Sequence, residues 1–387
     1  MKAKLLIQLL VCVLIATSCI MAVEPIDLSS KITDRANLSN MNLSGMNLSN
    51  KNLNQSNIQD ANLKGTNFNG TYLRSAWLTN SYMEYARFVK ADLTEAVLDD
   101  ADLNNSDFSE STLRWAHMSK SRLNDACLVK ADLTEADLSD CDLTGSNMTD
   151  ARLFRTDLSG AKLRGIYLVS ANLIGAHLSW ADISEGYLSS GQFSRAELYS
   201  TNLSGSDLND ADFTRAYLMR ADLTEANMNW ANFAYADMTE ANMAGASLNS
   251  ARLPYADLTR ANLTGVDFSD ADMSSIRLIG SILNKAKLNR VNLRELDMRG
   301  VSMKGASLRN SNLADVFLTN ANMSGVDFRD VTLDRVEMTG VDLSGANLER
   351  IKYDQFTLYS LAKSKLDGAK ISDNLKKDLK SLSGGTL

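Results

Sequence analysis

The chain has 387 residues, with 40 Lys and Arg against 47 Asp and Glu, 4 Cys, 2 His and 2 Pro. A net charge of -7 lacks the basic footprint of a nucleic-acid binder, so no nucleic-acid partner is expected. Two His leave little for His-based catalysis or a His-rich metal site. With 44% hydrophobic residues, the chain is not a disordered polyelectrolyte.

The first 22 residues have the pattern of an export signal. Two lysines precede an apolar run over residues 5–16 that only Gln8 interrupts. This run is too short for a comfortable transmembrane helix, and its positive flank is typical of a secretory signal. The sequence therefore predicts a signal peptide over residues 1–22, followed by an N-terminal lead-in over residues 23–35.

Two processing sites compete within that signal. A small residue, Ala22, precedes one site and suits signal peptidase. Residues 16–19 read Ala-Thr-Ser-Cys and resemble a bacterial lipobox, which would make residues 1–18 a lipoprotein signal and put a lipid anchor on Cys19. The predicted location is thus exported: periplasmic, secreted or in the outer membrane as a lipoprotein. A membrane contact is expected only through Cys19.

A five-residue repeat runs through most of the chain. Every fifth position from 38 to 348 is Leu, Met, Phe or Ile, which makes 63 successive pentapeptides without a slip of phase. Two residues before these positions, a small residue stands at 49 of the 63 sites: Ala at 33, and Ser, Thr, Cys or Gly at 16.

A period of five excludes both common elements. On an α-helix the Leu residues would scatter around the axis, and on a flat strand they would alternate between the two faces. The small residue and the Leu are two apart, so both face one side of a short extended segment. Each pentapeptide therefore contains an extended side and a corner, and successive sides wind into a β-solenoid with Leu and Ala inside. The spacing alone does not distinguish three sides per coil from four.

The pattern A-(D/N)-L-x-x over residues 36–350 resembles the pentapeptide-repeat family. It is written, for example, as Ala-Asn-Leu-Ser-Asn at 36–40 and Ala-Asp-Leu-Thr-Glu at 91–95. The resemblance implies an all-β fold, a right-handed quadrilateral β-helix with one pentapeptide per side. Four sides would give about 16 coils and a rod on the order of 75 Å long.

The repeat fades after residue 350. Leu358, Leu361, Ala362 and Leu366 have helical spacing, and residues 373–382 are typical of a second short amphipathic helix. We expect residues 351–387 to form a helical C-terminal cap that covers the last strand edge, because bare edges promote association.

Two sets of outward aromatics are the candidate binding residues. The residue before each Leu is normally Asn or Asp, which suits hydrogen bonding in a turn. Four successive departures, with one further Tyr nearby, form a candidate interaction belt: Tyr72, Trp77, Tyr82, Tyr85 and Arg87. With four sides per coil, residues 20 apart stack on one side, which predicts an aromatic ladder of two pairs: Tyr167 with Tyr187, and Tyr235 with Tyr255.

No catalytic residue, cofactor or metal site is predicted. His117 and His177 are separated by three coils, and Cys127 faces outward while Cys141 faces inward, so these cysteines are not expected to pair. The chain has no phosphate-binding glycine motif and no Cys-x-x-Cys.

The sequence thus predicts a non-catalytic exported protein that serves as a rigid structural or protein-interaction scaffold in the cell envelope. Its partner is an unidentified protein or envelope component, and the chain is expected to be a monomer or an end-to-end dimer. Two alternatives stay open. Some pentapeptide-repeat proteins resemble an acidic DNA duplex and inhibit DNA gyrase, and an aromatic ladder on a solenoid can instead receive sugar rings.

Overall fold

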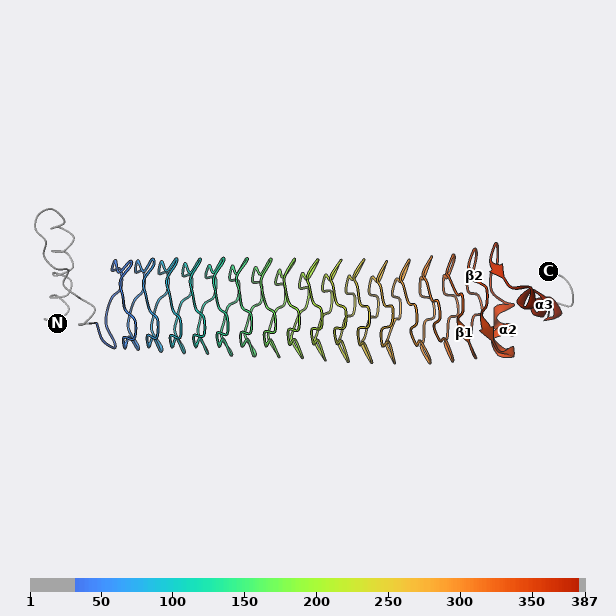
Figure 1. The fold of residues 1–387 in the computed structure, drawn as a ribbon, viewed down its shortest axis with the longest axis horizontal. Helices are drawn as coiled ribbons and strands as arrows, with labels where there is room; N and C mark the ends of the chain where they lie inside the picture. Colours follow the sequence, from blue (N-terminus) through green and yellow to red (C-terminus); the bar gives the residue numbers. More distant parts are fainter. Residues whose placement is uncertain (1–31, 383–387) are drawn as a thin grey trace, which may run out of the picture.

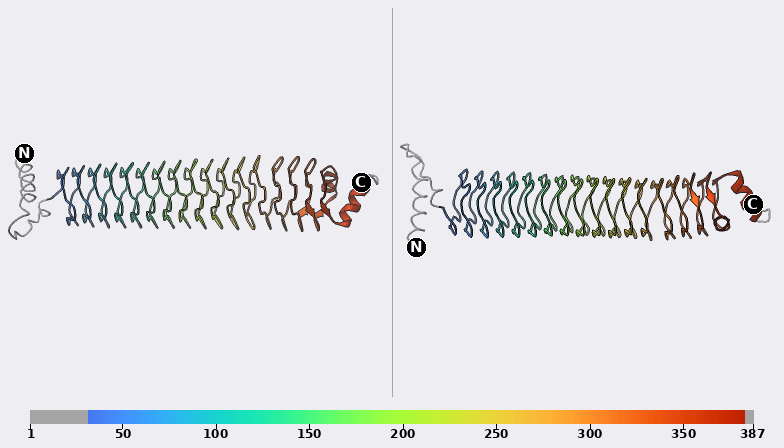
Figure 2. Two further views of the ribbon diagram at one scale, coloured as in Figure 1. Left: turned by 90° about the horizontal axis from the view of Figure 1, so that it is seen from above. Right: turned by 60° about the horizontal axis from the view of Figure 1, so that its bottom comes forward.

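A computed structural model describes residues 32–382 as one long rod of stacked coils (Figure 1). The rod keeps its form in the two further views, and the helices lie at its C-terminal end (Figure 2). The named elements all belong to that end: β1 (Thr332–Leu333), β2 (Asn347–Leu348), β3 (Lys352–Tyr353), α2 (Gln355–Leu361), β4 (Lys370–Ile371) and α3 (Asp373–Leu382).

Each pentapeptide consists of a three-residue extended side and a two-residue turn. The middle residue of the side, which precedes the Leu, forms a parallel bridge with the residue 20 positions later, as Asn37 does with Asn57. Four pentapeptides therefore make one coil. The second turn residue has a positive φ, between 50° and 73°, at every fifth position from Arg35 to Arg350. A positive φ at this position is the signature of a type II turn.

Main-chain hydrogen bonds join each coil to the next. The N–H of Leu223 donates to the carbonyl of Asn242 (2.7 Å), and that of Glu225 donates to Ala244 (3.0 Å). The small residue after the turn, Ala226, donates back to the carbonyl of Leu223 (3.1 Å) and closes the corner. The same donors recur in nearly every repeat, so the backbone is satisfied without long strands.

The Asn or Asp before each Leu accepts the remaining amide. Asp132 Oδ1, for example, accepts from the backbone N–H of Thr134 (3.1 Å) and from its hydroxyl (2.6 Å). This contact confirms the turn role predicted from the sequence and explains why short side chains with an acceptor oxygen dominate the position.

The core consists of the two inward columns predicted from the repeat. The large residues at every fifth position from Leu38 to Leu348 are at most 3% exposed. Phenylalanines that are 20 apart stack face to face, as Phe68, Phe88 and Phe108 do at 4.8 and 4.6 Å. Where Thr or Ser replaces Ala, its hydroxyl in most cases donates to a carbonyl, so the buried polar group is paired.

The C-terminal segment mixes helices with further ladder steps. β3 pairs in parallel with β1, with Thr332 opposite Lys352, so the coil continues past residue 350. β4 pairs with β2 at a distance of 23 residues, with Asn347 opposite Lys370. The expectation of helices alone over 351–387 was therefore incomplete, because these extended residues return to the ladder between and before the helices.

Hydroxyl groups of α2 take the place of a further coil on two sides of the rod. Thr357 Oγ1 accepts from the N–H of Val336 (2.9 Å) and donates to the carbonyl of Leu333 (3.2 Å). Ser360 Oγ accepts from the N–H of Met338. α3 is tied to β3 by the hydroxyl of Tyr353, which donates to Asp378 (2.7 Å). None of the described helices is long and apolar enough to cross a membrane.

The variant Thr357→Val/Ser360→Ala should loosen the last coil. It removes the acceptors of two buried amides at a cost of about 1–3 kcal/mol each. Hydrogen exchange of Val336 and Met338 should accelerate, while amides in the middle of the rod keep their rates. Ser381→Ala, which removes an exposed hydroxyl of α3, is the control. Unchanged protection in the double variant would contradict the assigned role of α2.

Candidate interaction surface

Three columns of side chains face outward on each side of the rod. They are the residue before each Leu and the two turn residues, and each column repeats every 20 residues. A binding surface on this fold is therefore built from residues 20 apart in one column, together with the neighbouring columns of the same side and corner.

The predicted belt does not form one surface. Tyr72, Trp77, Tyr82 and Arg87 are exposed but lie on four successive sides of a coil. Tyr85 occupies the turn that follows Tyr82, with the Lys64 ammonium 5.6 Å from its ring centre. A partner that binds one side of the rod meets one or two of these residues, so the belt stays a prediction only for a partner that encircles the rod.

The predicted stacking of the tyrosine pairs is confirmed. The rings of Tyr167 and Tyr187 lie 4.7 Å apart at 10°, and those of Tyr235 and Tyr255 lie 4.9 Å apart at 8°. The two pairs occupy different columns, because Tyr235 and Tyr255 are turn residues with positive φ. Stacking covers one face of each ring, and the Arg215 guanidinium lies 5.6 Å from the Tyr235 ring centre.

A more compact aromatic group lies on the side whose central column passes through Trp77, His177 and Tyr217. We call it the aromatic patch. It consists of Tyr217, which is exposed on that side, and of three turn residues at the corner that follows the side: Trp180, Tyr199 and Met219. Trp180 and Tyr199 meet edge to face at 5.5 Å, and Trp180 is 66% exposed. Met219 follows Tyr199 in the same column, one coil later.

A charged row borders the patch. Arg220 donates from Nη1 to the Tyr199 hydroxyl (3.0 Å) and from Nε to Glu240 (2.8 Å), and it thereby holds Tyr199 in place. The Arg220 guanidinium also lowers the pKa of the Glu240 carboxyl below its usual range. On the same side, His177 Nδ1 lies 2.9 Å from Glu197 Oε2.

The candidate residues predicted from the sequence did not include Trp180, Tyr199, Tyr217 or Met219. The predicted ladder paired identical residues 20 apart, whereas Tyr199 and Met219 are different residues at the first turn position. Their separation of 20 residues was the available signal. Trp180 and Tyr199 are 19 residues apart in the sequence. They are in contact only because the column of first turn residues and the column of second turn residues lie side by side at one corner.

The described part of the chain offers no metal centre, since no group of three His, Cys, Asp or Glu side chains in it is placed to hold an ion. Cys127 and Cys141 are both free thiols, as expected from their opposite directions. Cys141 is buried and its thiol donates to the carbonyl of Met118 (2.8 Å).

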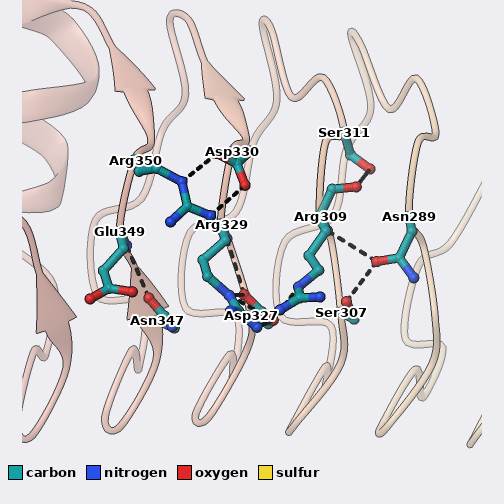
Figure 3. A network of polar contacts seen from close by, with 10 residues as sticks. All are labelled: Asn289, Ser307, Arg309, Ser311, Asp327, Arg329, Asp330, Asn347, Glu349 and Arg350. Atoms are coloured by element: carbon teal, nitrogen blue, oxygen red, sulfur yellow. Dashed lines mark hydrogen bonds and ion pairs between the residues drawn. The ribbon is translucent and has the colours of Figure 1, made fainter.

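Charge is distributed unevenly along the rod. Residues 32–270 contain 19 Lys and Arg against 31 Asp and Glu, a net charge of -12, whereas residues 271–382 contain 18 against 14, a net charge of +4. In the second part, arginines in neighbouring coils share carboxylates (Figure 3). Asp327 Oδ2 accepts from Arg309 and Arg329, both at 2.7 Å.

The next pair in the same region is Arg350 and Asp330, whose two hydrogen bonds are 2.7 and 2.8 Å long (Figure 3). The Arg350 guanidinium lowers the pKa of the Asp330 carboxyl. Because both side chains are exposed, solvent screens the attraction, and the pair contributes little to stability by itself.

The architecture defines the class of protein as a β-solenoid with four pentapeptides per coil. The family model for pentapeptide repeats matches in segments between residues 34 and 350. The chain therefore belongs to the pentapeptide-repeat family. Comparison with curated protein sequences finds no significant match.

Three solved structures illustrate the likeness. HetL, a pentapeptide repeat protein involved in heterocyst differentiation regulation in the cyanobacterium Nostoc, is 34% identical over 50% of this chain and 88% of its own (TM-score 0.41). A pentapeptide repeat protein of the Arabidopsis thaliana thylakoid lumen is 26% identical over 30% of this chain and 67% of its own (TM-score 0.18). QnrB1, a plasmid-mediated fluoroquinolone resistance protein, is 15% identical over 63% of this chain and 97% of its own (TM-score 0.23).

The two described thiols should differ sharply in reactivity. Burial raises the pKa of Cys141 to about 12, so it stays protonated and shielded at pH 8. Cys127 is partly exposed. A thiol reagent at pH 8, followed by peptide mass spectrometry, should label Cys127 and leave Cys141 unlabelled until the chain is unfolded. Rapid labelling of native Cys141 would contradict its inward position.

Proposed function

We propose that the protein is a non-catalytic, exported scaffold that binds a protein partner through the aromatic patch. The observation that carries the proposal is the presence of Trp180, Tyr199, Tyr217 and Met219 around one corner of a hydrogen-bonded rod. Aromatic residues and Met are enriched in the buried centres of protein interfaces, and Arg220 at the border adds a further typical interface residue.

The backbone supports this role because it presents the patch without a folding cost on binding. Each turn of the patch is held by bonds to the next coil, such as Trp180 N–H to Tyr199 O (2.9 Å) and Arg220 N–H to Thr239 O (3.0 Å). A surface held in its binding geometry loses little conformational entropy when the partner docks.

Export is the part of the proposal that rests on residues 1–22, which lie outside the described residues, as does Cys19. The working form of the scaffold is the right-handed rod of about 16 coils with its helical cap. Because α2 satisfies main-chain groups that a next coil would otherwise pair with, we propose that the C-terminal end resists end-to-end addition of a second copy.

The gyrase alternative has one supporting observation, the net charge of -12 over residues 32–270. These residues form about 12 coils, or roughly 57 Å of rod, over which a DNA duplex carries about 34 phosphate charges. The acidic surface therefore has about a third of the charge it would imitate. The sugar-binding alternative has less support still, because stacking covers ring faces that a sugar would need.

The proposal is tested by partner capture with a matched control. The patch variant Trp180→Ala/Tyr217→Ala and the control Tyr72→Ala/Tyr82→Ala each remove two exposed aromatics, and both should fold like the wild type by circular dichroism. A partner captured from native cell fractions is then purified and titrated against all three proteins. The patch variant should bind at least tenfold more weakly and the control should bind like the wild type, since each buried aromatic anchor is worth about 2 kcal/mol.

Two outcomes would contradict this proposal. Equal affinities of the patch variant and the wild type would remove the patch from the interface, and a loss confined to the control would favour the belt. Inhibition of purified DNA gyrase by the wild type, in a supercoiling assay, would instead support the alternative function.

A further inference from the structure

The ladder between neighbouring coils is interrupted at one place. Seven inter-coil bonds are missing there, and no other bond of this kind is missing between residues 57 and 310 of the described chain. The amides that lack their inter-coil acceptor are those of Met273, Ser275, Leu278, Gly280, Asn292, Asp297 and Ser302. The bridges that would pair Asp272 with Asn292 and Arg277 with Asp297 are absent as well.

The interruption affects two adjacent sides of the coil. On the opposite two sides only the bond of Ser302 N–H is missing, and Ile282 and Ser302 still form a bridge. On these opposite sides, Leu283 N–H donates to Ser302 O (2.7 Å) and Leu288 N–H donates to Ser307 O (2.7 Å). Among the described residues, no hydrogen bond or ion pair joins 271–280 to 291–300. The two coils are thus attached along one edge and open along the other.

An open crevice of about 450 Å³ lies in the gap, and the spacing of the coils is visibly wider there in the amber part of the rod (Figure 1). Its lining includes side chains from both coils: Ser275, Ile276, Arg294, Glu295, Leu296 and Asp297. These residues stand on the open sides, so the crevice and the missing bonds describe the same opening.

Two large side chains in the small-residue column account for the opening. Ile276 and Leu296 are 20 residues apart, so they lie one above the other where most coils have Ala above Ala. The turn bond from Ile276 N–H to Met273 O lengthens to 3.4 Å, and the corresponding bond from Leu296 to Leu293 is absent. Overpacking at a position built for a methyl group shifts the backbone, and the ladder bonds are lost as a result.

We propose that this opening is a joint at which the rod bends. Bonds on two sides hold the coils together, while the other two sides have no bond that resists opening or closing, which is the arrangement of a hinge. The part before the joint, residues 32–290, has a net charge of -9, and the part after it, residues 291–382, has a net charge of +1. The rod is therefore two stiff bodies, one acidic and one nearly neutral, that can meet a partner at different angles.

Hydrogen exchange tests the joint directly. In the wild type, amides of Met273, Ser275, Leu278 and Gly280 should exchange at least tenfold faster than the equivalent amides one coil earlier, which donate to the next coil. The variant Ile276→Ala/Leu296→Ala should restore their protection. Val316→Ala is the matched control, because Val316 lies in the same column and also lacks its turn bond, while Phe317 N–H still donates to Leu296 O (3.1 Å).

Bending is measured separately, by the distribution of rod angles in electron micrographs. Wild-type rods should show a spread of angles at about this position, and the double variant should be straight. Equal protection of the four amides and their counterparts in the wild type, or straight rods in both proteins, would overturn the proposal.

A pair of engineered cysteines keeps the test valid if the double variant fails to fold. Ser274→Cys/Arg294→Cys spans the gap, and Pro254→Cys/Ser274→Cys spans two bonded coils in the same column. Under mild oxidation the second pair should form its disulfide at least tenfold faster, because the two cysteines of the first pair can react only when the joint closes. Equal rates would contradict an open joint.

Discussion

The size of one inward side chain governs the geometry of the whole rod. In most repeats the residue after the turn donates its N–H back to the Leu carbonyl three positions earlier, and its side chain must fit beside the same residue of the next coil. Ala satisfies both demands, as in the 3.1 Å bond from Ala226 to Leu223. Ser and Thr also fit because their hydroxyls reach a carbonyl, as in the bond from Thr66 to Leu43. Where this column holds Ile276 above Leu296, the turn bond of Ile276 lengthens, that of Leu296 is absent, and the ladder opens.

This dependence separates structural from functional positions. Inward residues and the Asn or Asp before each Leu are determined by packing and by main-chain hydrogen bonding, so they carry little information about partners. The two turn residues tolerate large side chains even where φ is positive, as at Trp180 and Tyr255. Exposed aromatic residues therefore occupy corners as well as the centres of sides, and the aromatic patch arises where the turn columns of neighbouring coils adjoin the central column of one side.

The two stretches that depart from the repeat have opposite consequences. At the C-terminal end, Thr357 and Ser360 of α2 supply oxygens to amides that a next coil would otherwise satisfy, so the backbone stays paired where the repeat stops. At the joint, nothing replaces the missing bonds. One departure completes the ladder and the other interrupts it. A stiff scaffold with one flexible position can place its acidic part and its C-terminal part against surfaces that are not collinear.

The sequence by itself determined the phase of the repeat, the two inward columns and the role of Asn and Asp in the turns, because these follow from contacts within five residues. It also predicted that Tyr167 meets Tyr187, once a coil of 20 residues was assumed from the family. The tertiary structure alone decided which corners bring Trp180 to Tyr199, that residues beyond 350 rejoin the ladder, and that Ile276 with Leu296 opens it. These features depend on how neighbouring coils stack, and a periodic sequence specifies each coil far better than it specifies the fit between two coils.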